Sequence, residues 1–236
     1  DLRYVNSDSD GNGIYDYIAI IDCNESVTKI EIPAEIEDIP VVEIESSAFN
    51  GCANLTSIII PDSITSIGDF AFENCSGLTS ITIPDSVTSI GDHAFHNCSG
   101  LTSITIPDSV TSIGDHAFYN CLTSITVSEN NKYFSSLNGV LFNKDKTELI
   151  TYPIGNERTE YTIPDSVTSI GNFIFYNCSS LTSITIPDSV ASIGNSAFYN
   201  CSSLTNIKLP DVIDIISGNT FRDCSSLLNI IIPDSV

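Results

Sequence analysis

The sequence contains no tryptophan and no methionine, and only 8 of its 236 residues are lysine or arginine. Aspartate and glutamate number 30, so the formal net charge at pH 7 is −22. Because a chain this acidic repels polyanions, we expect neither nucleic acid nor an anionic lipid surface as a partner. No apolar run approaches the roughly 20 residues that a membrane-spanning helix needs, so the sequence predicts no membrane insertion.

Motifs of the common enzyme classes are also missing. The sequence has no G-x-S-x-G nucleophile elbow, no H-E-x-x-H zinc motif, no P-loop and no dinucleotide-binding G-x-G-x-x-G after a strand. Its serine, aspartate and cysteine residues instead recur at fixed intervals, whereas a catalytic group is needed only once. We therefore predict that the chain is not an enzyme.

The most informative feature that is present is a repeat of 23 residues. A fixed period of this length is typical of a solenoid, because each copy is too short to bury its own apolar face and must share a core with its neighbours. No linker or charge run divides the chain, so we expect one elongated domain. The repeat is marked by prolines in two series: Pro61, Pro84 and Pro107, then Pro164, Pro187, Pro210 and Pro233.

The copy at 78–100 shows what one coil should look like. Ile81 and Ile83 alternate with hydroxyl residues, which predicts a short strand with one buried face. Pro84 begins a turn, because proline presets φ. Asp92 is placed to cap a single helical turn. The side chains expected to face the core from this helical turn are Ala94, Phe95 and Cys98.

The pattern L-x-x-I-x-I-P-x-x-V-x-x-I-G-x-x-A-F-x-x-C resembles the BspA-like class of leucine-rich repeats over about residues 30–236. The segment 23–52 also looks like the opening coil of that family. The resemblance implies a mostly β α/β solenoid, a right-handed leucine-rich-repeat stack with a parallel sheet, 23-residue coils and short helical turns. It also implies a secreted or cell-surface protein, usually of bacteria, that acts in adhesion and protein binding.

Two parts of the chain depart from the period. Residues 1–29 are expected to form capping strands, and the solenoid at 30–236 is interrupted near 121–161. In this interruption, 139–153 is typical of a β-hairpin with a polar turn. The last copy stops partway at Val236 without a polar cap. We therefore expect that the natural chain continues, or that this end packs against another molecule, as in end-to-end self-association.

Candidate binding residues follow from these departures. The outward strand positions form a nearly uniform serine and threonine surface that varies only near the end, and in leucine-rich repeats partners usually dock on this face. An insertion in a solenoid often carries the binding role, although a variant coil packed as structure is the alternative. We expect a protein or glycan ligand, with a passive spacer as the rival function. The candidate residues are Lys132, Tyr133, Lys144, Lys146, Asn206 and Lys208.

One segment suggests a metal site near the N-terminus. Oxygen-bearing side chains occupy loop positions 1, 3, 5 and 9, with glycine at position 6, which resembles the first part of an EF-hand calcium loop. Ala19 stands where that loop needs an acidic ligand, so a turn between two strands is the alternative. Calcium is the cofactor that this segment suggests. The four ligand candidates are Asp8, Asp10, Asn12 and Asp16.

Cysteine and histidine also recur in columns. One cysteine per coil would have its Cβ vector parallel to that of the next, so we predict reduced, buried thiols and no disulfide framework. The three histidines, His93, His96 and His116, fall in adjacent coils. They suggest either a zinc or nickel cluster or surface residues copied by duplication. The cysteine column comprises Cys52, Cys75, Cys98, Cys121, Cys178, Cys201 and Cys224.

Overall fold

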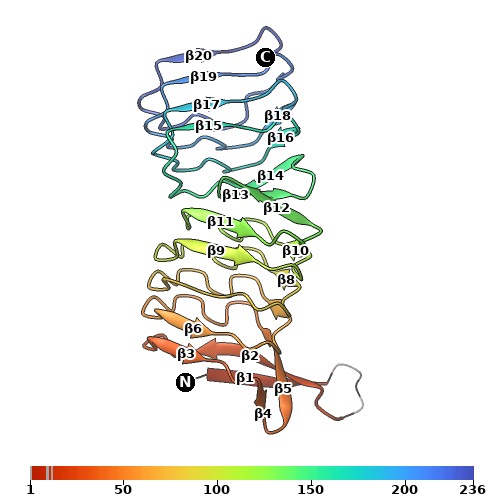
Figure 1. Cartoon of the computed structure of the whole chain (residues 1–236). Helices are drawn as coiled ribbons and strands as arrows, with labels where there is room; N and C mark the ends of the chain where they lie inside the picture. The colour runs from red at the N-terminus through yellow and green to blue at the C-terminus, as the bar shows by residue number, and fades with distance from the viewer. Residues whose placement is uncertain (1, 9–10, 12) are drawn as a thin grey trace. The chain divides into compact units, whose positions relative to one another are not determined.

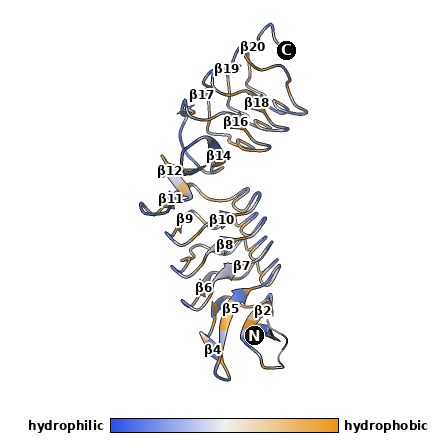
Figure 2. Ribbon diagram, turned by 90° about the vertical axis from the view of Figure 1, so that its right-hand side faces the viewer, coloured by the Kyte–Doolittle hydropathy of each residue, from blue (hydrophilic) through white to orange (hydrophobic). Residues whose placement is uncertain are grey.

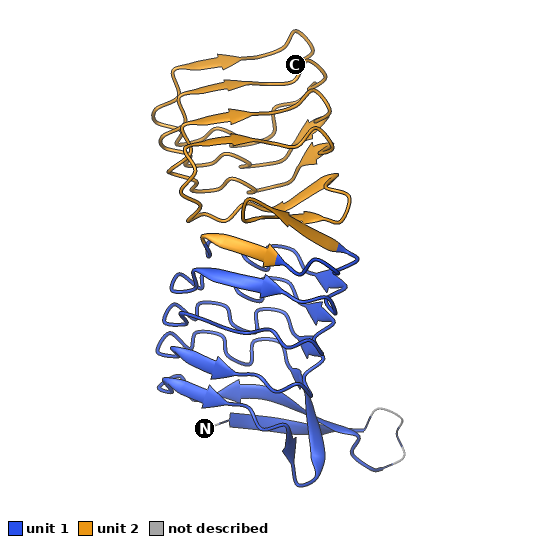
Figure 3. Ribbon diagram, viewed as in Figure 1, with its two compact units in different colours: residues 1–122, 127–133 blue, residues 123–126, 134–236 orange. Residues whose placement is uncertain are grey.

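The computed structural model describes residues 2–8, 11 and 13–236 of the chain. It divides into two compact units (Figure 3): Asp1–Leu122 with Val127–Tyr133, and Thr123–Thr126 with Phe134–Val236. Both units are stacks of coils made of short strands and turns, so the mostly β solenoid is confirmed. Hydrophilic and hydrophobic residues alternate along the coils of each unit (Figure 2). No helix able to cross a membrane occurs among the described residues.

Unit 1 contains a sheet that begins with an antiparallel pair and continues with parallel strands (Figure 1). β1 pairs antiparallel with β2, so strands form in the N-terminal segment where capping strands were expected. The sequence did not predict β4, a short strand that pairs antiparallel with β5 to form a β-hairpin. The strands are β1 (Leu2–Ser7), β2 (Tyr17–Cys23), β4 (Glu35–Ile36), β5 (Ile39–Ile44), β7 (Ser66–Ile67), β8 (Ser89–Ile90) and β10 (Ser112–Ile113).

A second strand face of unit 1 is less continuous. β3 (Lys29–Glu31) pairs in parallel with β6 (Ser57–Ile59), and Ser57 makes one isolated bridge to Ser80. Residues 81–83 are not in a strand, whereas the next coil forms β9 (Ser103–Ile106). This face therefore contains a break at one coil.

Unit 2 has two sheets. The predicted hairpin is confirmed as the antiparallel pair β13 and β14. An additional strand, β12, was not predicted, although the Asn138-Gly139 pair with φ of 57° and 82° makes the two-residue turn that joins it to β13. The strands are β12 (Phe134–Leu137), β13 (Val140–Asn143), β14 (Glu148–Thr151), β16 (Ser169–Ile170) and β18 (Ser192–Ile193) in one sheet, and β15 (Glu160–Thr162), β17 (Ser183–Thr185), β19 (Asn206–Lys208) and β20 (Asn229–Ile231) in the other. β11 (Ser124–Val127) lies where the sequence passes from one unit to the other.

The 23-residue register is visible in both units. Ser66, Ser89 and Ser112 are direct partners in unit 1, and Ser169 pairs with Ser192 in unit 2. At the insertion the step is shorter, since Glu148 pairs with Ser169. The second strand of the inserted hairpin thus takes the place of a coil strand.

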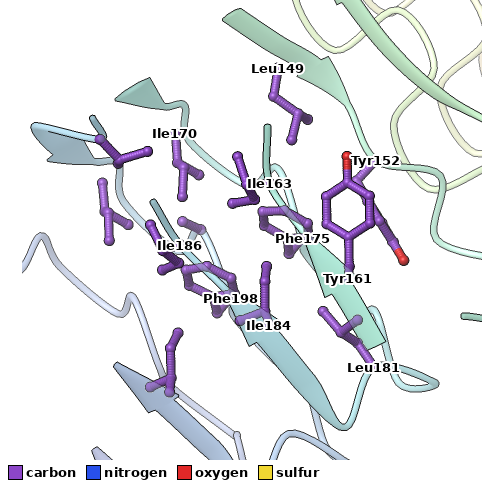
Figure 4. Packing of buried hydrophobic residues seen from close by; sticks show 14 of the residues in the cluster. Leu149, Tyr152, Tyr161, Ile163, Ile170, Phe175, Leu181, Ile184, Ile186 and Phe198 are labelled. Carbon is purple, nitrogen blue, oxygen red and sulfur yellow. The ribbon is translucent and has the colours of Figure 1, made fainter. Parts of the chain in front are cut away.

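The core consists of apolar columns that run along each stack. In unit 1 the rings of Phe72 and Phe95 stack at 5.2 Å between centroids. In unit 2, Phe175 and Phe198 stack at 5.0 Å, and Tyr152 contacts Phe175 at 4.9 Å (Figure 4). Two buried tyrosines, Tyr152 and Tyr161, therefore extend the aromatic core beside the insertion. Stacked burial of this kind is the main source of stability in a solenoid.

The predicted helical turn is wrong. An α-helix needs hydrogen bonds from N–H groups to carbonyls four residues earlier. Here the His93 and Phe95 N–H groups instead donate to carbonyls of the next coil, those of Asp115 at 2.9 Å and Ala117 at 2.7 Å. His93 also has φ of 53°, in the left-handed region. The backbone uses its donors between coils, so it forms a series of tight turns with no helix in the described residues.

The prediction that every cysteine of the column is reduced is also wrong. Cys52 forms a disulfide with Cys23, 29 residues earlier. Cys23 lies at the end of β2, outside the column, so the argument from parallel Cβ vectors does not apply to this pair. The column cysteines that remain as free thiols are Cys75, Cys98, Cys121, Cys178, Cys201 and Cys224.

Candidate binding surfaces

The strand surface of unit 2, defined as the outward side chains of β15, β17, β19 and β20, is the most regular candidate. Parallel pairing sets these side chains in register from coil to coil: Glu160 beside Ser183, Ser183 beside Asn206, and Asn206 beside Asn229. The alternate residues of each strand point inward, so the outer row is free to face solvent. This surface is therefore flat and rigidly spaced, as a docking face requires.

The candidates Asn206 and Lys208 both lie on this surface and are exposed. The Asn206 side chain donates to Thr205 Oγ1 at 3.0 Å and accepts from Asn229 Nδ2 at 3.1 Å. At β20 and the residue before it the surface becomes apolar, with Leu228 80% exposed and Ile231 59% exposed. Lys208 on β19 is the direct partner of Ile231 on β20, and Leu228 immediately precedes β20.

Lys132 and Tyr133 lie in unit 1, in the segment that follows the last regular strand. Both are exposed, and the Tyr133 ring is 51% exposed. Asn131 fixes this segment, because its buried amide donates to the carbonyls of Pro107 at 2.7 Å and Val110 at 3.0 Å. Its Oδ1 accepts from the Tyr133 N–H at 2.8 Å. The tyrosine therefore projects from an anchored backbone.

Lys144 and Lys146 lie in unit 2, in the turn between β13 and β14. Asn143 organises this turn, since its Oδ1 accepts from the Thr147 N–H at 2.9 Å. The Lys146 carbonyl accepts from Ser166 Oγ at 2.7 Å. The insertion thus carries two groups of candidates, one in each unit.

The suggested calcium loop is described only in part, because Asp10 and Asn12 lie outside the described residues. The two carboxylate oxygens of Asp8 accept the N–H groups of Gly11 and Gly13, each at 2.7 Å. Asp16 donates its N–H to the Ser7 carbonyl at 2.7 Å. These bonds are typical of the alternative, a turn held by an aspartate side chain. Calcium binding here stays a prediction.

The three histidines form a ring cluster on the turn side of unit 1. The His93 ring lies 5.2 Å from that of His96 and 5.3 Å from that of His116. His96 Nδ1 lies 3.0 Å from a carboxylate oxygen of Glu73. Burial lowers the pKa of His96 and of His116 below the ordinary value. Among the described residues, no group of three or more His, Cys, Asp or Glu side chains could hold a metal ion.

The free thiols are poor candidates for chemistry. Burial raises the pKa of Cys75 to about 12, and it raises that of Cys98 further. Each donates to a carbonyl of the preceding coil, Cys75 to Phe49 and Cys98 to Phe72, both at 3.0 Å. A thiol that stays protonated is a weak nucleophile and a weak metal ligand. These cysteines act as small apolar side chains in the core.

Comparisons with known proteins agree with this architecture. A leucine-rich repeat protein from Eubacterium ventriosum is 28% identical, with a TM-score of 0.74, and the match covers 92% of this chain and 67% of that one. Below 25% identity, where only the fold is shown, a leucine rich cell surface protein from Faecalibacterium prausnitzii has 23% identity, a TM-score of 0.60 and coverage of 98% and 92%. A pneumococcal vaccine antigen has 18% identity, a TM-score of 0.58 and coverage of 97% and 85%.

A search of curated proteins found no match. The profile described as "BspA type Leucine rich repeat region" matches with six copies over residues 21–147 and 154–236. These residues are the coils whose strands, turns and buried columns are described above. The chain belongs to the BspA type leucine-rich repeat family.

Proposed function

We propose that this chain is a non-catalytic protein- or glycan-binding module of a secreted or cell-surface protein. The observation that carries the proposal is the strand surface of unit 2, where exposed side chains stand in register on four parallel strands. Leucine-rich repeats typically bind proteins, which supports the protein arm. The exposed aliphatic side chains of Leu228 and Ile231 beside Lys208 give this surface an apolar contact and a cation.

The disulfide supports a location outside the cytoplasm. Disulfides such as Cys23–Cys52 form and persist in oxidising compartments and are rare where thiols are kept reduced. The Faecalibacterium neighbour, which shares the fold, is itself described as a cell surface protein. An extracellular or surface location is thus part of the proposal.

A binding screen tests the proposal. The chain would be immobilised and exposed to extracellular matrix proteins and to plant polysaccharides, and binding would be followed by biolayer interferometry. For any ligand found, we expect Lys208→Ala with Ile231→Ser to weaken binding at least tenfold, because anchor residues carry most of the binding energy. Ser179→Ala, an exposed position in a turn of the same unit, is the matched control.

Three results are informative. A tenfold loss confined to the strand-surface variant supports the proposal. If Tyr133→Ala, or Lys144→Ala with Lys146→Ala, weakens binding and the strand-surface variant does not, the binding site lies in the insertion. That result contradicts the use of the strand surface. Absence of binding to every protein and glycan contradicts the function itself and favours a passive spacer.

A further inference from the structure

The strand face of unit 1 contains a cleft of about 330 Å³. It lies between residues 80–83 and the parallel segment of the next coil, β9, at the place where the strand ladder is broken. Its volume is at the lower end of the range for small-molecule sites, roughly 300–1,000 Å³. The polar side chains that line it are Ser80, Thr82, Asp85, Ser103, Thr105 and Ser128.

The cleft is open because two coils are joined at the turn side but not at the strand side. On the turn side the Phe95 N–H donates to the Ala117 carbonyl at 2.7 Å. On the strand side, the described residues include no ladder pairing between 80–83 and β9. Ile81 and Ile104 are buried, so backbone groups and outward hydroxyls remain to form the walls.

The break in the repeat closes one end of the cleft. Where a regular coil would have Pro-Asp-Ser, this coil has Ser128, whose N–H donates to the Ile106 carbonyl at 2.9 Å. Asn131 then ties the segment to Pro107, another residue of the lining. The anchored segment leads directly to the exposed ring of Tyr133. The irregular coil therefore shapes the cleft, and a perfect repeat would leave this end without Ser128.

The hydroxyls of the cleft differ from those of a neighbouring column. The Thr79 and Thr88 hydroxyls donate hydrogen bonds to carbonyls of the preceding coil, those of Thr56 at 3.3 Å and Thr65 at 3.2 Å. In the described part of the chain, the side chains of Ser80, Thr82, Ser103 and Thr105 have no protein partner. A hydroxyl both donates and accepts, so these four can bond to ligand donors and acceptors alike.

We propose that this cleft binds one residue of a neutral saccharide, which specifies the glycan arm of the proposed function and rests on it. Adjacent sugar hydroxyls also donate and accept, so they complement four free hydroxyls and the acceptor Asp85. An anionic ligand is opposed by that carboxylate and by the net charge of −22. A hard cation needs six or more oxygen ligands, most of them carboxylates or carbonyls. The volume suits a single ring better than a peptide.

Saturation-transfer NMR on the intact chain tests this inference. The probes are methyl glycosides of glucose, galactose, mannose and N-acetylglucosamine at millimolar concentration, with methyl glucuronide as the anionic comparison. We expect transfer to at least one neutral glycoside and not to the glucuronide. Asp85→Ala and Thr105→Val should each weaken its binding about fivefold to tenfold, through the loss of one hydrogen bond.

The chain offers a matched control, because the decapeptide LTSITIPDSV occurs at 78–87 and 101–110, which line the cleft, and again at 181–190. Asp188→Ala and Thr185→Val change the same positions in a coil that is paired on both sides, so they should leave glycoside binding unchanged. Equal losses in these controls, no transfer from any neutral glycoside, or tighter binding of the glucuronide would each overturn the inference. If the chain binds a protein ligand but no glycoside, only the saccharide inference for the cleft is wrong. If it binds neither, the proposed function is wrong as well.

Discussion

The same ten residues, LTSITIPDSV, occur twice in unit 1 and once in unit 2, and their strand pairing differs between copies; the copy at 101–110 contains β9. At 181–190 they form β17, which pairs with β15 on one side and β19 on the other. At 78–87 they make only the single bridge from Ser80 to Ser57. Since the sequences are identical, the difference comes from the neighbouring coils and not from strand propensity. A local pattern decides which side chains point inward, but the stack decides which backbones pair.

The largest effect that we expect comes from removing a buried phenylalanine ring, which should destabilise only the unit that contains it. Phe95 and Phe198 are fully buried and stacked between two other rings. Phe95→Ala or Phe198→Ala should cost about 3–5 kcal/mol of unfolding free energy through cavity formation. Urea unfolding followed by hydrogen exchange should show lost protection in the unit that holds the variant.

Ser99→Ala, an exposed position in a turn of unit 1, serves as the control and should change stability by less than about 0.5 kcal/mol. The comparison fails if Phe95→Ala removes protection equally from both units. In that case the two units unfold as one cooperative block, contrary to the nearest-neighbour behaviour of a repeat stack.

The second largest difference between the units should come from loss of the disulfide, which should destabilise unit 1 and leave unit 2 unchanged. Cys23–Cys52 closes a loop within unit 1, and unit 2 has no disulfide among its described residues. Cys23→Ser with Cys52→Ser should destabilise unit 1 by about 3 kcal/mol, because the unfolded chain regains the entropy of that loop. Unit 2 should keep its hydrogen-exchange protection.

Dithiothreitol provides the paired measurement. The reductant should lower the urea midpoint of the parent and leave that of the double variant unchanged. A midpoint that falls in the double variant as well would show that the reductant acts elsewhere, and an unchanged parent would show that the bond contributes nothing.

Acidification should lower the stability of unit 1 relative to that of unit 2 by a smaller amount, because all three histidines are in unit 1. Burial holds the pKa of His96 and of His116 below the unfolded value of 6.5. The unfolded chain therefore binds protons first, so stability is complete above pH 6.5 and falls as the pH drops below that value. Both rings are partly exposed, with 20% of the His96 side chain accessible, so solvent screening should keep the loss below about 1 kcal/mol.

The neighbours of these rings limit the effect. Glu73 faces His96, and Asp92 and Asp115 face His116, and their charges favour protonation, whereas His93 opposes it. Urea midpoints of unit 1 between pH 7.5 and 5.5 give the measurement, with His96→Gln plus His116→Gln as the comparison. A fall in stability that persists in this double variant would remove the histidines as the cause.

The errors in the sequence-based predictions have a common physical origin. The 23-residue period and the inward columns were readable, because they depend on the side-chain pattern of single coils. The turn at 92–98 was read as helical because its N–H groups bond to the next coil, which no local signal reveals. Cys23 was missed as a disulfide partner because it lies outside the column. The cleft was hidden because residues 78–95 and 101–118 of the two coils that border it are identical in sequence.

The smallest effect concerns two hairpin turns that hold left-handed residues. In unit 2, Lys146 has φ of 54°, and in unit 1, Asp38 has φ of 65°. A left-handed conformation costs a residue with a Cβ roughly 1–2 kcal/mol, and less for aspartate. Substitution by glycine removes this cost, but part of the gain is lost because glycine gives the unfolded chain more conformational entropy. Lys146→Gly should therefore stabilise unit 2 by about 0.5 kcal/mol, and Asp38→Gly should stabilise unit 1 by less. Thermal unfolding monitored per unit checks the order. If Asp38→Gly gave the larger gain, the cost of these turns would lie in their packing and not in the backbone conformation.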